Sequence, residues 1–188
     1  MEPFEDSSNI DTYKRILGHH TAFANNNGKI WLFSQQDIQI QIISDINQHL
    51  TIMAQHQNWT EGVLLTVVYA ACNASIRMEL WESLSDLARQ YTNPWLVGGD
   101  FNVILSEEEK LGGLQVYYQE TEDFANFNGG LFDMGYSGSI VTLWNGRTDT
   151  TSIFKRLDRI LCNQRFIDKY PNVSVKHLIK KGSDHSPL

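Results

Sequence analysis

Residues 94–102 read PWLVGGDFN, and the rest of the chain can be interpreted outward from this stretch. Its apolar residues 95–98 predict a short buried strand, and the segment Gly99-Asp100-Phe101-Asn102 follows the end of that strand. Pro94 closes the element before it, where apolar residues recur at helical spacing over 75–90. The sequence therefore predicts an amphipathic helix, then a buried strand, then a polar loop where side chains can reach a site.

Other strands are expected on both sides of this unit, together with two short helices. The expected strands are 29–33, 38–43, 49–54, 63–70, one within 154–162, and 173–179, and the further helices are 121–128 and 164–169. Strands and helices mix without strict βαβ alternation, which favours a layered α/β (α+β) sandwich. With 188 residues, 41% of them hydrophobic, the chain is expected to form a single domain.

The charge balance narrows the possible functions. A net charge of -7 does not suit a protein that grips nucleic acid through a broad basic face. It does suit a site rich in carboxylates, where a divalent cation supplies the positive charge. Neither Cys72 nor Cys162 has a second cysteine at metal-ligand spacing, so both are expected to be small buried apolar residues in a reducing compartment.

The amino terminus is acidic and carries no apolar run, so no signal peptide is expected. No stretch is long and apolar enough to predict a membrane span. We expect an intracellular protein of the nucleus or cytoplasm, not secreted, without contact with a membrane and without an obligate protein partner.

Three short segments carry residue types suited to chemistry: GDFN (99–102), RLDR (156–159) and SDH (183–185). Each places an aspartate at or near an expected strand end, where a single aspartate is usually a turn or cap residue. Their combination in this order is more specific than any one of them. Arg156 and Arg159 could be either salt-bridge partners or phosphate binders, and residues 107–110 are expected to form a solvated loop or helix start.

The order of these segments, with Thr142, Trp144 and Asn145 between the first two, resembles the endonuclease/exonuclease/phosphatase family. Residues 94–113 are most similar to the nuclease domain of plant LINE-type (non-LTR) retrotransposons. Tyr69 and the helix that carries Arg77 resemble the tyrosine strand of the family and the helix after it. The resemblance implies a DNase I-like fold, in which two mixed β-sheets are flanked by helices.

The resemblance also implies roles for these residues. Glu2 and Asp184 would hold Mg²⁺ (or Mn²⁺), a hard cation that prefers oxygen ligands, and Asp100 could add a third carboxylate. Asp100 and Asn102 would position the attacking water. Asp158 would orient His185, which would contact the phosphate or act in acid–base work.

Further residues are expected near a DNA substrate. Tyr69 would donate to a phosphate oxygen, and Thr142, Trp144, Asn145 and Arg77 would line the substrate site. Simpler interpretations stay open: Tyr69 could be a core residue, Trp144 a packed aromatic, and Asn145-Gly146 a turn.

The sequence also departs from the family pattern. The family begins with a strand that carries an asparagine shortly before the metal-binding glutamate, whereas Glu2 here follows Met1 directly and the chain stops at Leu188. We therefore expect one domain over 1–188, truncated at both ends, that lacks the first strand and the end of the last. The leading hypothesis is a magnesium-dependent, retrotransposon-derived endonuclease that nicks DNA, as a weakly active or inactive fragment; the alternatives are a small-molecule phosphatase and a catalytically dead scaffold.

Overall fold

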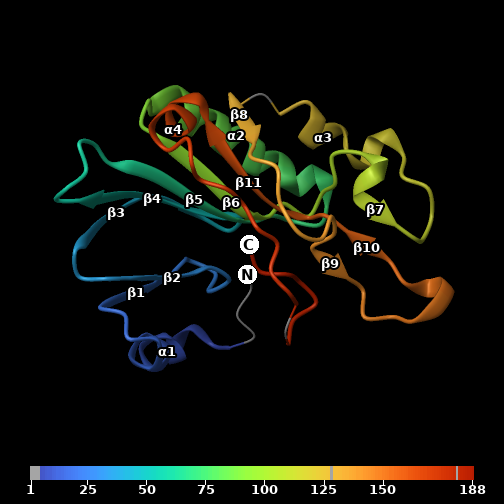
Figure 1. The fold of residues 1–188 in the computed structure, drawn as a ribbon, viewed down its shortest axis with the longest axis horizontal. Coiled ribbons are helices and arrows are strands. Elements are labelled where there is room, and N and C mark those ends of the chain that lie inside the picture. The colour runs from blue at the N-terminus through green and yellow to red at the C-terminus, as the bar shows by residue number, and fades with distance from the viewer. Residues whose placement is uncertain (1–4, 128, 181) are drawn as a thin grey trace.

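A six-stranded sheet forms the centre of the computed structural model, which describes residues 5–127, 129–180 and 182–188 (Figure 1). Its strand order is β3-β4-β5-β6-β11-β8. Neighbouring strands are antiparallel except β5 and β6, which are parallel. The strand bounds are β3 Ile38–Ile46, β4 His49–His56, β5 Val63–Tyr69, β6 Trp95–Asp100, β8 Leu131–Asp133 and β11 Asp158–Asn163.

Helix α2 (Ala74–Gln90) connects the two parallel strands and covers one face of the sheet. Asn73 caps its first turn by accepting a hydrogen bond from the Ile76 amide. Leu80, Leu84 and Leu87 pack against alternate residues of β5 and β6, as the helical spacing predicts. Arg77 occupies the buried side of the first turn, whereas Ile76 faces solvent.

The opposite face of β5 packs against a hairpin of β1 (Thr21–Ala24) and β2 (Trp31–Ser34), beside the surface helix α1 (Ile10–Leu17) and the short 3-10 turn η1 (Ser7–Asn9). Leu64 and Val68 contact the α2 side, whereas Leu65 and Val67 contact the hairpin side. Both faces of β5 are thus covered, in agreement with its nearly continuous apolar sequence. Helix α4 (Gln164–Lys169) packs through Phe166 beside Cys162 of β11.

A second, smaller antiparallel sheet has the order β7-β10-β9 and lies beyond the end of the central sheet (Figure 1). Its strands are β7 Lys110–Leu111, β9 Leu143–Trp144 and β10 Phe154–Lys155. The 3-10 turn η2 (Glu107–Glu109) leads from β6 into β7, and η4 (Asp149–Thr151) connects β9 and β10. The 3-10 turn η3 (Tyr118–Glu120) and helix α3 (Glu122–Ala125) lead from β7 back to β8 of the central sheet. The layered α/β architecture expected from the sequence is confirmed.

Several local expectations were wrong. Residues 173–179 form one isolated bridge, between Lys176 and Ser137, instead of a strand. The helix expected over 121–128 spans only Glu122–Ala125, and the strand expected within 154–162 is split into β10 and β11. Helix α1 and the strands β1, β7, β8 and β9 were not expected from the sequence; each of these strands has four residues or fewer, too few to show a period.

The two cysteines differ in environment. Cys162 is buried as expected, but Cys72 is exposed because it lies in the loop between β5 and α2. In the ranges that the structure describes, no helix has both the length and the apolar character needed to span a membrane.

Candidate active site

Tyr69, Asp100 and Asp158 lie side by side at one edge of the central sheet. Tyr69 ends β5, Asp100 ends β6, and the parallel register pairs the two residues. Asp158 begins β11, and the antiparallel register pairs it with Asp100. Residues that are far apart in the sequence are therefore brought together by strand pairing, on adjacent strands of the central sheet.

The backbone around Asp100 has two unusual conformations. Gly99 has φ 136°, and a Cβ atom there would lie 2.1 Å from the Val68 carbonyl oxygen, so only glycine fits between the strands. Asn102 has φ 50°, in the left-handed region that asparagine tolerates better than most residues. Such strain is common at functional sites, where the surrounding structure holds it in place.

Asn102 fixes the carboxylate of Asp100. Its backbone amide donates to Asp100 Oδ1 at 2.8 Å, and its side-chain Nδ2 donates to Asp100 Oδ2 at 3.1 Å. The same Nδ2 also donates to the Ala70 carbonyl at 2.8 Å. The two side chains thus form one unit that is tied to the end of β5.

His185 reaches this unit from the carboxyl-terminal segment. Residue 185 forms a bridge with Leu143, which places the imidazole over the sheet edge. Its Nδ1 lies 2.7 Å from Asp158 Oδ2, and its Nε2 lies 3.9 Å from Asp100 Oδ2. A carboxylate can only accept, so Asp158 selects the form of His185 that carries a proton on Nδ1.

The cluster has more negative than positive charge, and its pKa values respond to this. Burial and the neighbouring charge of Asp158 raise the pKa of Asp100 to about 6. Burial alone would lower the pKa of His185, but the hydrogen bond and charge of Asp158, with Asp100 and Asp184, raise it above the usual value. Burial, followed by the charge of Asp100, raises the pKa of Tyr69.

Comparison with known proteins identifies this arrangement. The model of the Endonuclease/Exonuclease/phosphatase family matches residues 5–185, nearly the whole chain. The chain belongs to this family. Enzymes of the family generally use divalent metals, and the strand arrangement is the DNase I-like fold that the sequence predicted. No curated protein matches the chain.

Solved structures agree with the fold. The endonuclease domain of TRAS1, a telomere-specific non-LTR retrotransposon, aligns with a TM-score of 0.63 and 14% identity, over 96% of this chain and 89% of that one. A functionally unknown conserved protein from Enterococcus faecalis V583 aligns with a TM-score of 0.60 and 16% identity, over 96% and 79%. TDP2 from Caenorhabditis elegans aligns with a TM-score of 0.56 and 12% identity, over 86% of this chain and 52% of that one. At these identities the likeness shows the fold.

Thr142, Trp144 and Asn145 were expected to line the substrate site, and the structure places each of them in a different environment. Thr142 is fully buried, and its Oγ1 accepts from the amides of Leu157 and Asp158, so it supports the start of β11 instead of facing a substrate. Trp144 is half-buried and stacks on Phe154 with ring centroids 6.2 Å apart. Asn145 is half-buried and closes a turn through hydrogen bonds with Arg147, Thr151 and Ile153, as the simpler interpretation held.

Arg77 was expected to contact substrate, and its position does not fit that role. Its side chain is 2% exposed, and its Nε and Nη2 donate to the carboxylate of Asp123. Its Nη1 donates to the carbonyls of Ala71, Cys72 and Asn102. Arg77 therefore clamps the loops after β5 and β6 from inside the molecule, and no single local motif in the sequence indicated its partner, Asp123.

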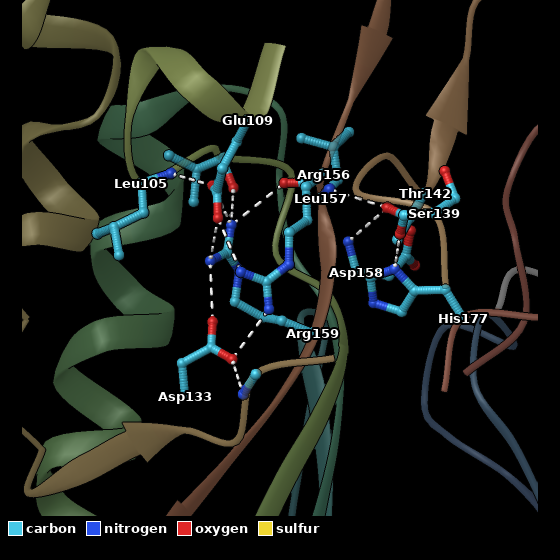
Figure 2. A network of polar contacts seen from close by, with 12 residues as sticks. Leu105, Glu109, Asp133, Ser139, Thr142, Arg156, Leu157, Asp158, Arg159 and His177 are labelled. Atoms are coloured by element: carbon cyan, nitrogen blue, oxygen red, sulfur yellow. Dashed lines mark hydrogen bonds and ion pairs between the residues drawn. The ribbon is translucent and has the colours of Figure 1, made fainter. Parts of the chain in front are cut away.

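Arg156 and Arg159 each form salt bridges with Glu109 and Asp133. Of the two roles left open by the sequence, salt-bridge partner or phosphate binder, the structure shows the first. Figure 2 shows both guanidinium groups between Glu109 and Asp133, behind the strand that carries Asp158. Arg159 is fully buried, with Nη2 2.8 Å from Glu109 Oε2. A solvated loop or helix start was expected over 107–110; residues 107–109 form the 3-10 turn η2, but Glu109 is not solvated, because it is buried against both arginines.

The residues present fit a hard divalent cation. Oxygens of Asp100 and Asp158 and a nitrogen of His185 all lie within 4.8 Å of one another. Burial and the charge of Asp158 raise the pKa of Asp100, so a cation beside these two carboxylates would stabilise the ionised form of Asp100. The exposed Asp184, whose charge reaches Tyr69 and His185, adds a further carboxylate, while Glu2 lies outside the described residues.

Proposed function

We propose that this chain is a divalent-cation-dependent phosphodiester hydrolase that nicks DNA. The observation that carries the proposal is the convergence of Asp100, Asp158 and His185 at one sheet edge, with an excess of negative charge. A phosphodiester is anionic and resists attack by water, so such a site suits it only when a cation offsets the charge.

The side chains have positions that suit hydrolysis of a P–O bond. Asp100, with a pKa of about 6, is mostly ionised at neutral pH and can accept the proton of a water that Asn102 helps to hold. The water oxygen forms the new bond to phosphorus, the bond to the leaving sugar oxygen breaks, and that oxygen can take the Nε2 proton of protonated His185. Protonated His185, held by Asp158, and Tyr69 can donate hydrogen bonds to phosphate oxygens, where negative charge develops.

Asp100, Asp158 and Asp184 would hold the cation, for which we propose Mg²⁺, with Mn²⁺ as a substitute. When bound, the cation supplies charge neutralisation at the phosphate and at the leaving oxygen. The proton transfers remain the work of Asp100 and His185.

DNA as the substrate, and an origin in a plant LINE-type retrotransposon, are parts of the same proposal. They are supported by the likeness of residues 94–113 to such nucleases and by the fold shared with the TRAS1 endonuclease domain. The net charge of -7 favours a small phosphorylated substrate instead, which keeps a phosphatase as the second candidate.

Nicking of supercoiled plasmid DNA tests the proposal. We expect conversion to open circles with Mg²⁺, and loss of conversion with EDTA and in Asp158→Asn and Asp184→Ala. Asp168→Asn, which changes an exposed carboxylate on α4, is the matched control and should nick like wild type. Phosphate release from small esters without nicking would indicate the phosphatase, and a folded protein with neither activity would indicate a scaffold.

A further inference from the structure

An apolar groove with a volume of about 510 Å³ opens beside the catalytic histidine. Trp144 and Phe154 of the small sheet form one side, and Leu178 and Ile179 of the carboxyl-terminal segment form another. Ile179 is 92% exposed, which is unusual for a side chain of this type in a folded protein. A groove of this size suits a nucleotide-sized group better than a double helix.

The charge of this groove is opposite to that of the molecule. Lys176 and Lys180 line it, and none of its lining residues, all of which the structure describes, is acidic. The larger groove between α2 and α3, about 750 Å³, is lined by Glu82, Asp86, Glu122 and Asp123 with one arginine. An anionic ligand of a chain with net charge -7 is therefore drawn to the groove with the lysines and repelled from the other.

The groove is continuous with the candidate active site. The Trp144 amide donates to the Asp184 carbonyl at 3.1 Å, and the Ser186 amide donates to the Thr142 carbonyl at 2.7 Å. Lys180 also donates to the Asp184 carbonyl, and its Nζ lies 5.9 Å from the centre of the Trp144 ring. A ligand in the groove would thus contact Ser186, the residue next to His185.

We propose that this groove binds one strand of the nucleic-acid substrate beside the scissile phosphate, with a base against Trp144 and the apolar wall, and phosphates on Lys176 and Lys180. The inference rests on the proposed function and extends it to the substrate, which would be unpaired at this point. An aromatic surface with flanking cations is the combination that binds single strands without reading their sequence. The lysine Nζ has three donors, so Lys180 can hold Asp184 and a phosphate together.

Binding of a labelled single-stranded oligonucleotide, followed by fluorescence anisotropy in EDTA, separates the groove from catalysis. The double variant Lys176→Ala/Lys180→Ala should bind at least about tenfold more weakly. The slope of log binding constant against log salt concentration should become shallower by about 1.4, because two phosphate contacts are lost. Trp144→Leu should weaken binding by about 5- to 100-fold. Lys14→Ala/Lys169→Ala, which changes the net charge equally on α1 and α4, should bind like wild type.

Equal affinities of the two double variants would overturn the proposal, since charge alone would then account for binding. Equally tight, lysine-dependent binding of an acidic peptide would also overturn it, since the groove would then suit a protein segment. Wild-type protein that does not nick plasmid but binds DNA through these lysines would refute the proposed function and support the groove. Wild-type nicking with an unchanged KM in Lys176→Ala/Lys180→Ala would refute the groove and keep the function.

Discussion

Two clusters of buried charge lie back to back on β11 and its neighbours, and they are built in opposite ways. Behind the strand, Arg156 and Arg159 meet Glu109 and Asp133, so two cations face two carboxylates. At the sheet edge, Asp100 and Asp158 meet the imidazole of His185, so two carboxylates face one group that can carry positive charge. The pKa of Glu109 is lowered despite its burial, because the arginines stabilise its charge, whereas burial and Asp158 raise the pKa of Asp100 to about 6.

This difference separates a structural cluster from a functional one. A balanced cluster holds elements together, and its removal should affect folding. An unbalanced cluster destabilises the cation-free protein and leaves a place where positive charge is favoured. The two clusters should therefore respond differently to substitution: the cluster at the sheet edge in catalysis, and the arginine cluster in stability.

The largest effect is expected for catalysis at the unbalanced cluster. His185→Ala should lower the rate of magnesium-dependent nicking by about 10²- to 10⁴-fold, because the group that donates to the phosphate is lost. The circular dichroism spectrum should stay that of wild type. His20→Ala, which changes an exposed histidine outside this cluster, is the control, and equal loss in both variants would contradict the assignment.

The balanced cluster should instead control stability. Arg159→Met should lower the free energy of unfolding by about 3–5 kcal/mol, because Glu109 would remain buried with one partner fewer. Urea unfolding measures this change. Arg165→Met removes an exposed ion pair with Glu61 and should cost no more than about 1 kcal/mol, so similar losses in both variants would show that burial is not the cause.

Much of the catalytic edge could be predicted from the sequence, and the balanced cluster could not. GDFN, RLDR and SDH are short local signatures, so Asp100, Asp158 and His185 could be selected before strand pairing was known. Arg77 and Asp123 are 46 residues apart, and Arg159 and Glu109 are 50 apart, with no local pattern to connect them. From the sequence, Arg77 was therefore expected at the substrate and Glu109 in solvent, whereas both side chains are buried in ion pairs.

Two histidines should titrate in opposite directions in EDTA. Burial lowers the pKa of His49 to about 4, and its ring nitrogens lie beside the hydroxyls of Ser83 and Thr51. His185, beside carboxylates, should titrate above the usual 6.5. NMR of the imidazole protons measures both values, and a shift of both in the same direction would contradict the contrast.

These shifts also set the pH dependence of stability. The contribution of neutral, buried His49 to the free energy of unfolding is fully present above pH 6.5. It is lost as the pH falls toward about 4, and the total loss is at most about 3 kcal/mol. The contribution of His185 is present below pH 6.5 and is lost as pH rises through its raised folded pKa. His49→Gln should therefore flatten the acid side of the stability profile, and His185→Gln the alkaline side, as measured by urea unfolding at several pH values.

A smaller effect is expected from chemical modification beside the site. The exposed Cys72 Sγ lies 3.5 Å from Asn102 Oδ1, so a bulky alkylating reagent there should reduce nicking by crowding the site. Mass spectrometry should find Cys72 modified and buried Cys162 unmodified. Cys72→Ser should nick normally and resist the reagent; continued sensitivity of that variant would place the effect elsewhere.

One substitution tests most directly whether Asp100 is kept at a cost in stability for the sake of catalysis. A pKa raised from 3.8 to about 6 corresponds to about 3 kcal/mol at most, so Asp100→Asn in EDTA at neutral pH should gain about 1–3 kcal/mol in unfolding free energy. In the same preparation, magnesium-dependent nicking should fall by about 10³-fold or more. A variant that loses stability, as a substituted core residue would, or that still nicks at the wild-type rate, would contradict the account.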